Sequence, residues 1–456
     1  MGTDMTRGNP LTVILKFMIP LFIGNVFQQL YNMADTIIVG RFVGQNALAA
    51  VGSTGTIMFL VMGFSMGLTS GFTVLTSQKF GAKDADGVRV SVANAVLLSV
   101  IVVAVLTALS TSVMHPMLKL MNTPAEIYQD AYTYIMIICA GTAATVSYNL
   151  MSSFLRAVGN SRMPLISLIF SACVNVVLDL VFIIFFDMGV AGAAWATNIS
   201  QALSALLCLG YVLKNVPELL PHKAQWHFHA WATAVQLRVG VPMALQFAIT
   251  ASGTMIMQAA INLYGAVAVA AITAAGKVQN VITQGDIAMG QSMATYAGQN
   301  YGKGDYERLT KGVRGSILVI AVYGIVAAFI SVFLLKPMLS LFFAPGTDMT
   351  AMLPYAKKYI YLCAVFYIPL GLIFIFRNTM QGCGYGLLPM LGGVVELFCR
   401  MAVAAASMAT MNFYLAAFCD PSAWIGAAIF TGIAYGIVMK KVRRTLHSDA
   451  ASDAAS

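Results

Sequence analysis

The residue that most needs a chemical explanation is Asp35, an acid within an apolar stretch long enough to cross a bilayer, PLFIGNVFQQLYNMADTIIVGRFVG (20–44). A charge inside a span costs about 3 kcal/mol on insertion scales, so such residues usually face a cavity and serve ion or substrate movement. Gln28 and Tyr31 precede Asp35 by seven and four residues, which places all three on one helical face. Pro20 removes a backbone hydrogen bond and predicts a bend. A neutral acid bonded to a carbonyl for packing is the alternative.

A second polar group lies in the apolar stretch 167–186, where Asn175 and Asp179 are four residues apart and share a helical face. Thr197, in the next apolar stretch, could add a hydroxyl. Two carboxylates, an amide and a hydroxyl form an all-oxygen set that suits a hard cation such as Na⁺. Burial and mutual repulsion would instead favour proton binding by one carboxyl. The residues themselves do not choose between Na⁺ and H⁺.

Composition indicates the element type that must position these groups. Of the 456 residues, 59% are hydrophobic and 9% are charged, and the mean hydropathy is +0.80, so we expect an all-α polytopic membrane protein. The net charge of +9 comes from basic residues between apolar stretches, as the positive-inside rule predicts, and indicates no nucleic-acid partner. The seven cysteines show no paired spacing, so neither disulfides nor a zinc site is expected.

Counting stretches of about 20 mostly apolar residues predicts twelve spans. They are 13–39, 47–77, 90–113, 128–155, 164–186, 190–213, 240–264, 268–298, 314–335, 353–380, 388–411 and 422–439. Lys and Arg gather in every second loop, which predicts that both termini are cytoplasmic. The polar segment 214–238 is expected to be an amphipathic cytoplasmic connector between an N-lobe (1–213) and a C-lobe (239–440), with a cytoplasmic tail at 441–456.

The two lobes repeat one design, because three landmarks of the first lobe return in the same order in the second. IPLFIG around Pro20 returns as VPMALQ around Pro242, SQKFGAKD with Gly81 returns as GQNYGKGD with Gly302, and LRAVGNSRMP with Gly159 returns as MQGCGYGLLP with Gly384. The shift along the chain is nearly constant from one landmark to the next. Each copy has an even number of spans, so we expect a pseudo-twofold axis along the membrane normal.

The acids of the first copy do not recur in the second. The shift from SQKFGAKD to GQNYGKGD makes Asp35 correspond to Ile256, and the shift from LRAVGNSRMP to MQGCGYGLLP makes Asp179 correspond to Ala404. Function is therefore expected to differ between the copies.

The second copy carries membrane charges of its own. Glu396 and Arg400 are four residues apart and are expected to form a structural ion pair that Arg377 could join. Lys277 and Asp286 are nine residues apart, about 13 Å along a helix, so they cannot pair directly, and both functional and structural roles stay open for them.

Two further patterns repeat along the chain. A methionine stripe that includes Met62 and Met66 fits either an adaptable substrate cavity or ordinary packing. Asp84 and Asp305 are expected to cap helices.

These segments together resemble the multidrug and toxic compound extrusion (MATE) family, in its DNA-damage-inducible F-like branch. The resemblance runs through the 20–44 stretch with ALAAVG, SQKFGAKD, LRAVGNSRMP, VNVVLDLVFI, GVAGAAWATNISQ, GQNYGKGD and GGVVELFCR. It implies two six-helix lobes in a V and export of bulky, often cationic compounds against an inward Na⁺ or H⁺ gradient. It places the coupling ion at Asp35, Asn175, Asp179 and Thr197, with Gln28, Tyr31 and Asn149 nearby and Pro20 as the bend. Another branch has an acid in the seventh span that QFAITASGTMIMQAAI lacks, so coupling through the second lobe is not expected.

The sequence therefore predicts a secondary active efflux antiporter in the inner (plasma) membrane. We expect a monomer with small-molecule substrates, organic cations among them, and with no cofactor, no enzymatic activity and no metal beyond a Na⁺ at the coupling site. GQNYGKGD lacks the P-loop pattern, and the few histidines lie in loops or at span ends, so neither an ATP-driven pump nor a catalytic site is indicated. The alternative is a lipid-linked oligosaccharide flippase of the same superfamily, for which more spans and a strongly cationic cavity would be expected.

The charge pattern yields a topology prediction. A tag at residue 225 and a tag at the C-terminus should both be protected from membrane-impermeant labels added to intact cells. Labelling of either tag from outside would contradict the twelve-span arrangement with parallel repeats.

Overall fold

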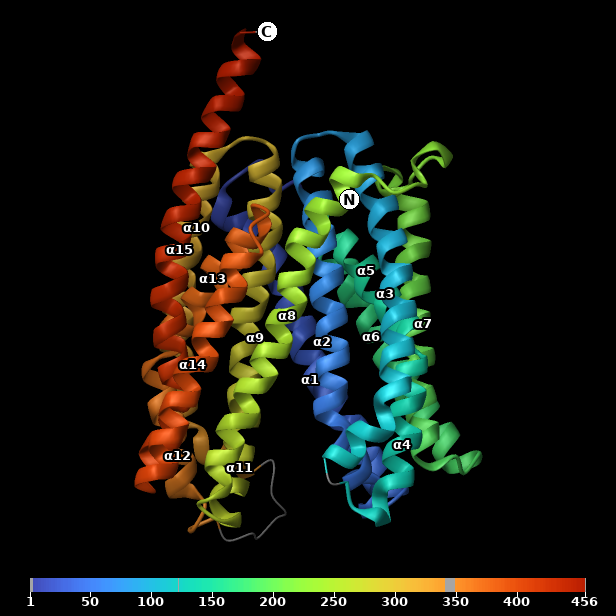
Figure 1. Ribbon diagram of the computed structural model, residues 1–456, viewed down its shortest axis with the longest axis vertical. Coiled ribbons are helices and arrows are strands. Elements are labelled where there is room, and N and C mark those ends of the chain that lie inside the picture. Colours follow the sequence, from blue (N-terminus) through green and yellow to red (C-terminus); the bar gives the residue numbers. More distant parts are fainter. Residues whose placement is uncertain (1–2, 122, 341–348, 456) are drawn as a thin grey trace. The chain divides into compact units, whose positions relative to one another are not determined.

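The computed structural model describes residues 3–121, 123–340 and 349–455, and within these ranges the chain is helical and has no strand (Figure 1). Its α-helices are α1 (Pro10–Phe42), α2 (Gln45–Gly81), α3 (Ala85–Leu120), α4 (Ala125–Ala140), α5 (Thr142–Ala157), α6 (Arg162–Leu180), α7 (Gly189–Asn215), α8 (Ala230–Asn262), α9 (Ala266–Gly302), α10 (Tyr306–Phe333), α11 (Leu335–Ser340), α12 (Leu353–Val365), α13 (Tyr367–Gly382), α14 (Leu387–Thr410) and α15 (Phe413–Ala455). A π-turn, η1 (Val181–Phe185), extends α6, and two 3₁₀ turns, η2 (Pro217–Leu219) and η3 (Lys223–Gln225), lie between α7 and α8.

The predicted spans correspond to observed helices. Among the described residues, ten helices are long and apolar enough to cross a membrane, and two bent pairs, α4 with α5 and α12 with α13, raise the total to as many as twelve. The all-α polytopic class is thereby confirmed. Two helices differ most from expectation: α8 begins at Ala230, inside the segment expected to be a connector, and α15 begins at Phe413, not near residue 422, and continues to Ala455 through the expected tail. At both starts the helix includes polar residues that are buried in protein, Gln236 and Asp420.

Each bent pair has a local cause. Between α4 and α5, Gly141 leaves room for the Asn198 side chain, and the Asn198 amide donates to the Ile137 carbonyl at 2.7 Å. A side chain thus satisfies a carbonyl at the point where the helix bends by 47°. Between α12 and α13, Pro369 cannot donate to the carbonyl of Val365, and its ring would clash with it, so α12 ends at Val365.

The helix bounds carry the repeat seen in the sequence. Helices α2 and α9 are both 37 residues long, and both of their ends are related by the shift that relates SQKFGAKD to GQNYGKGD. Helices α5 and α13 are both 16 residues long, and the shift that relates LRAVGNSRMP to MQGCGYGLLP relates their ends. The turn after α2 shows the same backbone in both copies: Lys83 has φ +58°, and Gly304, its counterpart, has φ +79°. Glycine takes this left-handed conformation at little cost, whereas lysine is strained in it.

The chain forms two compact units, and two helices contribute to both of them. Unit 1 comprises residues 1–4 and 19–247, and unit 2 comprises residues 5–18 and 248–456. Helix α1 passes from one unit to the other beside Pro20, and α8 does so a few residues after Pro242. The first part of α8 is thus a component of unit 1 although the repeat assigns it to the second copy. The expected lobes, 1–213 and 239–440, describe the repeat and stay a prediction.

In unit 1 the first part of α8 packs tightly on α2. A Cβ on Gly67 would lie 2.7 Å from the Ala244 Cα, and a Cβ on Gly71 would meet the backbone of Gly240, so only glycines allow this approach. Buried amides fix the same seam, because Asn94 Nδ2 donates to Gln236 Oε1 at 2.8 Å. Gln236 Nε2 in turn donates to the Ser91 carbonyl at 2.9 Å, so both buried amides of this seam have partners.

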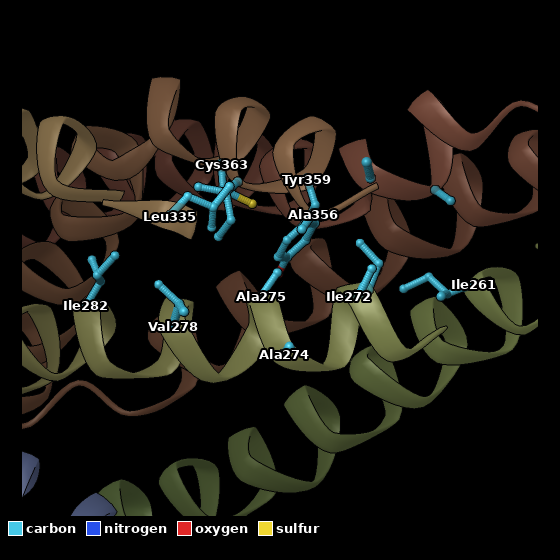
Figure 2. Packing of buried hydrophobic residues seen from close by; sticks show 14 of the residues in the cluster. Ile261, Ile272, Ala274, Ala275, Val278, Ile282, Leu335, Ala356, Tyr359 and Cys363 are labelled. Atoms are coloured by element: carbon cyan, nitrogen blue, oxygen red, sulfur yellow. The ribbon is translucent and has the colours of Figure 1, made fainter. Parts of the chain in front are cut away.

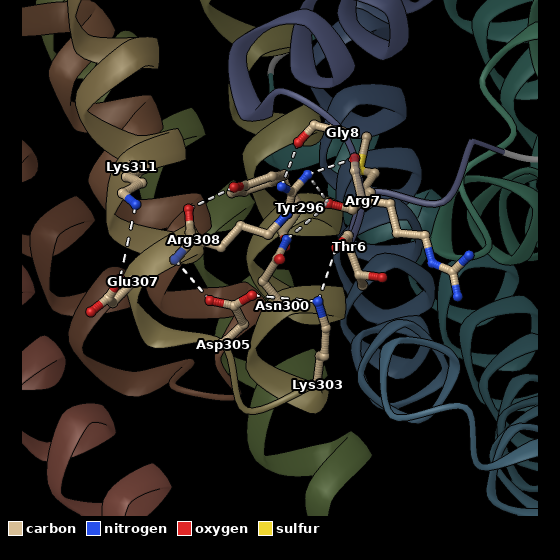
Figure 3. A network of polar contacts seen from close by, with 11 residues as sticks. Thr6, Arg7, Gly8, Tyr296, Asn300, Lys303, Asp305, Glu307, Arg308 and Lys311 are labelled. Atoms are coloured by element: carbon tan, nitrogen blue, oxygen red, sulfur yellow. Dashed lines mark hydrogen bonds and ion pairs between the residues drawn. The ribbon is translucent and has the colours of Figure 1, made fainter.

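Unit 2 is built around α9, whose alanines let neighbouring helices approach closely (Figure 2). Ala271, Ala274 and Ala275 are buried among side chains of α12 and α13, such as Tyr359 and Ile373. The N-terminal segment belongs to this unit and is held by α9 and α10 (Figure 3). The Arg308 guanidinium donates to the carbonyls of Met5, Arg7 and Gly8 at 3.0, 2.7 and 2.6 Å.

The two predicted helix caps are confirmed. Asp84 accepts from the Gly87 N–H at 2.8 Å at the start of α3, and Asp305 accepts from the Arg308 N–H at 2.9 Å at the start of α10. Lys79 Nζ also lies 2.8 Å from Asp84 Oδ2. The hydrogen bonds from Lys79 and from the Gly87 N–H lower the pKa of the Asp84 carboxyl below its ordinary value of 3.8.

Asp84→Ala should lower the free energy of unfolding by about 1 kcal/mol at pH 7, because the cap bond at the start of α3 is lost. A carboxyl whose pKa is lower in the folded state stabilises the fold fully above its ordinary pKa, and this contribution is lost as the pH falls through the lower, folded-state pKa. The difference between wild type and variant should therefore shrink below about pH 3.8. Thermal unfolding of the detergent-solubilised protein measures it, with the more exposed Asp86→Ala as a control. A difference that stays constant down to pH 2 would contradict the prediction.

Candidate functional site

In unit 1 the structure brings Asp35 of α1 and Asp179 of α6 together, and their carboxyl groups lie within hydrogen-bonding reach of each other. Asp179 is 0% exposed, and Asp35 is half-buried, with its Oδ1 atom buried and without a hydrogen-bond partner among the described residues. A carboxylate only accepts hydrogen bonds, so a bond between two carboxyl groups requires a proton on one of them. The pair that the sequence assembles from two distant stretches is therefore a site that can hold one shared proton.

Tyr31 and Thr197 extend this pair. The Tyr31 side chain, one helical turn before Asp35, forms a hydrogen bond with Thr197 of α7 and lies within electrostatic reach of both carboxyl groups. Asn175 is 0% exposed and lies one turn before Asp179 on the same face of α6. The residues expected at the coupling site thus lie on three helices of one unit.

Two features of the site escape sequence reasoning. Tyr134 of α4 is 2% exposed and lies within electrostatic reach of Asp35, Tyr31 and Asp179, but its position inside an apolar stretch gives no sign of this. Immediately after Asp179 the backbone widens into the π-turn η1 (Val181–Phe185). Such turns are uncommon and often occur at functional sites. Together these features set the acidic pair at an irregular end of α6.

The other residues expected in a substrate cavity contact residues other than Asp35 and Asp179, or are only partly buried. Gln28 donates to the Asn32 side chain of its own helix at 3.2 Å. Met62 packs against a core cluster that Val176 and Leu180 also contact. Asn149 and Met66 are half-buried on α5 and α2. Their assignment to a substrate cavity stays a prediction, and so does the role of Pro20 as a bend.

Unit 2 contains a buried chain of alternating charges. Glu396 lies 3.8 Å from Arg400 and 3.7 Å from Arg377, as expected for the pair and its third member. Arg400 Nε also donates to Asp420 Oδ1 at 3.0 Å, and the Tyr359 hydroxyl donates to Asp420 Oδ2 at 2.7 Å. The two arginines and two acids neutralise one another inside the unit. Asp420 lies between the predicted spans 388–411 and 422–439, so the sequence alone does not group it with these charges.

Asp286 and Lys277 of α9 lie in different surroundings. Asp286 is 2% exposed and lies within electrostatic reach of Tyr323 of α10 and Tyr367 of α13. A Cβ on Gly371 would lie 2.9 Å from Asp286 Oδ1, so glycine at this position leaves room for the acid. Lys277 is exposed, and no ion pair joins it to Asp286 or to any other acid within the described ranges.

The family model MatE matches residues 20–181 and 242–406, which are corresponding parts of the two copies. The chain belongs to the MatE family. The probable multidrug resistance protein YpnP of Bacillus subtilis is 33% identical over 315 residues, which cover 67% of this chain and 68% of that protein. The FAD transporter of Shewanella oneidensis is 26% identical and covers 88% of both chains.

A solved structure shares the fold of this MatE chain. The crystal structure of MATE in the bent conformation has a TM-score of 0.86 at 21% sequence identity and covers 99% of both chains. The chain is thus a multi-pass membrane protein of a transporter family.

For the charge chain of this MatE protein we predict a structural role. Asp420→Asn should lower stability by about 3 kcal/mol, because it leaves Arg400 buried with one partner fewer, and Glu396→Gln should act in the same direction. Thermal unfolding and protein yield measure this, with Glu307→Gln as the control, since the exposed Glu307–Lys311 pair at 3.9 Å contributes little. Normal yield and stability with a selective loss of transport would contradict the structural role.

Proposed function

We propose that this MatE chain is a secondary active efflux antiporter that exports amphipathic, often cationic, small molecules in exchange for inward-moving protons. The observation that carries the proposal is that the Asp35 and Asp179 carboxyl groups lie within hydrogen-bonding reach of each other inside membrane-spanning helices. A transporter needs a group that binds the coupling ion reversibly, and a carboxyl pair that shares one proton is such a group.

The pair favours H⁺ over Na⁺ as the coupling ion. Na⁺ would be held by deprotonated carboxylates, together with oxygens from groups such as Asn175 and Thr197. Two carboxyl groups this close can instead hydrogen-bond to each other when one of them is protonated, and Thr197 is already engaged with Tyr31. The donor set is thus arranged for a proton, while Na⁺ remains the competing coupling ion that the experiment below must separate.

Coupling follows from what proton loss does to the site. Two adjacent carboxylates in a poorly polarisable environment repel each other strongly, so deprotonation favours a state in which α1 and α6 separate at this level. Pro20 gives α1 a point at which it can bend. If substrate binding favours the deprotonated state, each ligand weakens the affinity for the other by the same factor.

The relatives support efflux as the direction and small molecules as the cargo. YpnP is named a probable multidrug resistance protein, and MepA of Staphylococcus aureus, 23% identical over 206 residues, is named a multidrug export protein. A lipid-linked oligosaccharide flippase is less consistent with this chain, because it would be expected to have more spans and no acidic pair. We further propose that the protein works as a monomer in the inner (plasma) membrane, with both termini in the cytoplasm.

Asp35→Asn should abolish gradient-driven efflux, because the amide keeps the shape of the side chain but cannot gain and lose a proton. Asp179→Asn should have nearly the same effect, and Asp286→Asn a milder one. The measurement is export of a cationic dye from reconstituted vesicles, with a pH gradient and a Na⁺ gradient imposed separately. We expect the pH gradient to drive the wild type and the Na⁺ gradient to be ineffective.

A matched control is Asp187→Asn. Asp187 lies in the exposed turn after η1 at φ +50°, a conformation that asparagine tolerates, so the variant should transport as the wild type does. Near wild-type pumping by Asp35→Asn under either gradient would refute the proposed coupling site. Efflux driven by Na⁺ alone would refute the choice of ion and leave the site in place.

A further inference from the structure

The exposed surface of unit 2 differs in polarity from helix to helix. Helices α10, α14 and α15 expose large apolar side chains suited to lipid, among them Leu318, Val322, Ile325, Phe329, Phe398, Ile429, Ile433 and Ile437. Helix α9 instead exposes Thr273, Lys277 and Asn280, which the spacings of four and three residues place on one face. We call these three residues the α9 stripe. One of the long hydrophobic helices of this unit thus presents a polar, positively charged surface.

The depth of Lys277 excludes lipid as the neighbour of the α9 stripe. Helix α9 is 37 residues long, about 55 Å, so Lys277 lies seven residues, about 10 Å, from the helix midpoint. A hydrocarbon core about 30 Å thick and centred on this helix therefore includes Lys277. A lysine that faces lipid inside the core costs up to about 3 kcal/mol. The α9 stripe therefore faces water.

Lys277 also has no anion of its own. The nearest acid on α9, Asp286, follows nine residues later, about half a turn away in direction and about 13 Å away along the axis. Asp286 is buried whereas Lys277 is exposed, and no ion pair of Lys277 occurs in the described part of the chain. The corresponding residue of the first copy, by the shift that relates α2 to α9, is Thr56. The positive charge thus belongs to the second copy alone, and none of the acids in the described part of the chain forms an ion pair with it.

We propose that the α9 stripe is a subsite for an anionic group, a phosphate or a carboxylate, on the transported molecule. This inference rests on the proposed efflux function and specifies its cargo: amphipathic molecules with an anionic group belong to the substrate range. The Lys277 ammonium forms a charge-assisted hydrogen bond to the anion, and the Asn280 amide adds a neutral donor. The chemistry agrees with the relative named a FAD transporter, since FAD carries phosphate groups.

The test compares two probes that differ by one phosphate, flavin mononucleotide and riboflavin. Binding of each to the purified full-length protein in lipid nanodiscs is followed by flavin fluorescence anisotropy. Wild type should bind flavin mononucleotide at least tenfold more tightly than riboflavin. Lys277→Gln should weaken binding of the nucleotide about tenfold and leave riboflavin unchanged, whereas Lys277→Arg should retain the preference. Lys311→Gln, at an exposed position of α10 outside the stripe, should bind as the wild type does.

Two results would overturn the proposal. One is a wild type that binds flavin mononucleotide no more tightly than riboflavin, a comparison that needs no variant and stands even if Lys277→Gln does not fold. The other is a Lys277→Gln protein with an unchanged preference for the nucleotide. The binding assay uses no gradient, so either result leaves the proposed efflux function untouched. That function is tested separately by pH-driven export of a cationic dye.

Discussion

A hydrogen bond between two carboxyl groups exists only while one of them carries a proton, and inside a membrane it has no simple substitute. Water would relieve two carboxylates in a soluble protein, but Asp179 is 0% exposed and most of the surroundings are apolar side chains. The pair must therefore keep the proton, bind another cation such as Na⁺ in its place, or be separated by a rearrangement of the helices around it. The bent pair α4 and α5, the π-turn η1 and the proline of α1 all occur in the unit that holds this pair. A fully regular bundle would leave no such freedom.

Much of the scaffold could be predicted because bilayer thickness sets the length of an apolar stretch and helical periodicity sets which of its residues share a face. Twelve apolar stretches, the repeat offsets, the Asp84 and Asp305 caps and the Glu396–Arg400 pair all depend on spacings of a few residues or on a fixed shift. Asp35 and Asp179 could be grouped because an acid in a span needs a partner and few candidates exist. The roles of Tyr134 and Tyr359 could not be predicted, because each lies in an apolar stretch that gives no sign of the acid beside it in the fold.

The remaining differences arise where one residue type has two possible roles. The bend at Gly141 depends on the Asn198 amide of α7, which fills the space that the glycine leaves. The residues of α4 and α5 alone therefore do not predict the bend. Asp420 precedes a proline, a combination typical of a loop, yet the helix continues because Arg400 and Tyr359 satisfy the acid. The apolar stretch alone predicts a span that begins near residue 422, whereas α15 begins at Phe413 because these tertiary contacts extend the helix.

The way α1 and α8 divide between the two units has a consequence for the origin of the repeat. The glycine face of α2 in unit 1 is covered by the first part of α8, which the repeat assigns to the second copy, and unit 2 likewise takes residues 5–18 from the first copy. A single copy of the repeat, expressed alone, would leave such a face bare. A half-length chain with this packing, if it preceded duplication, would have had to cover that face with the first helix of a second molecule, as an intertwined homodimer.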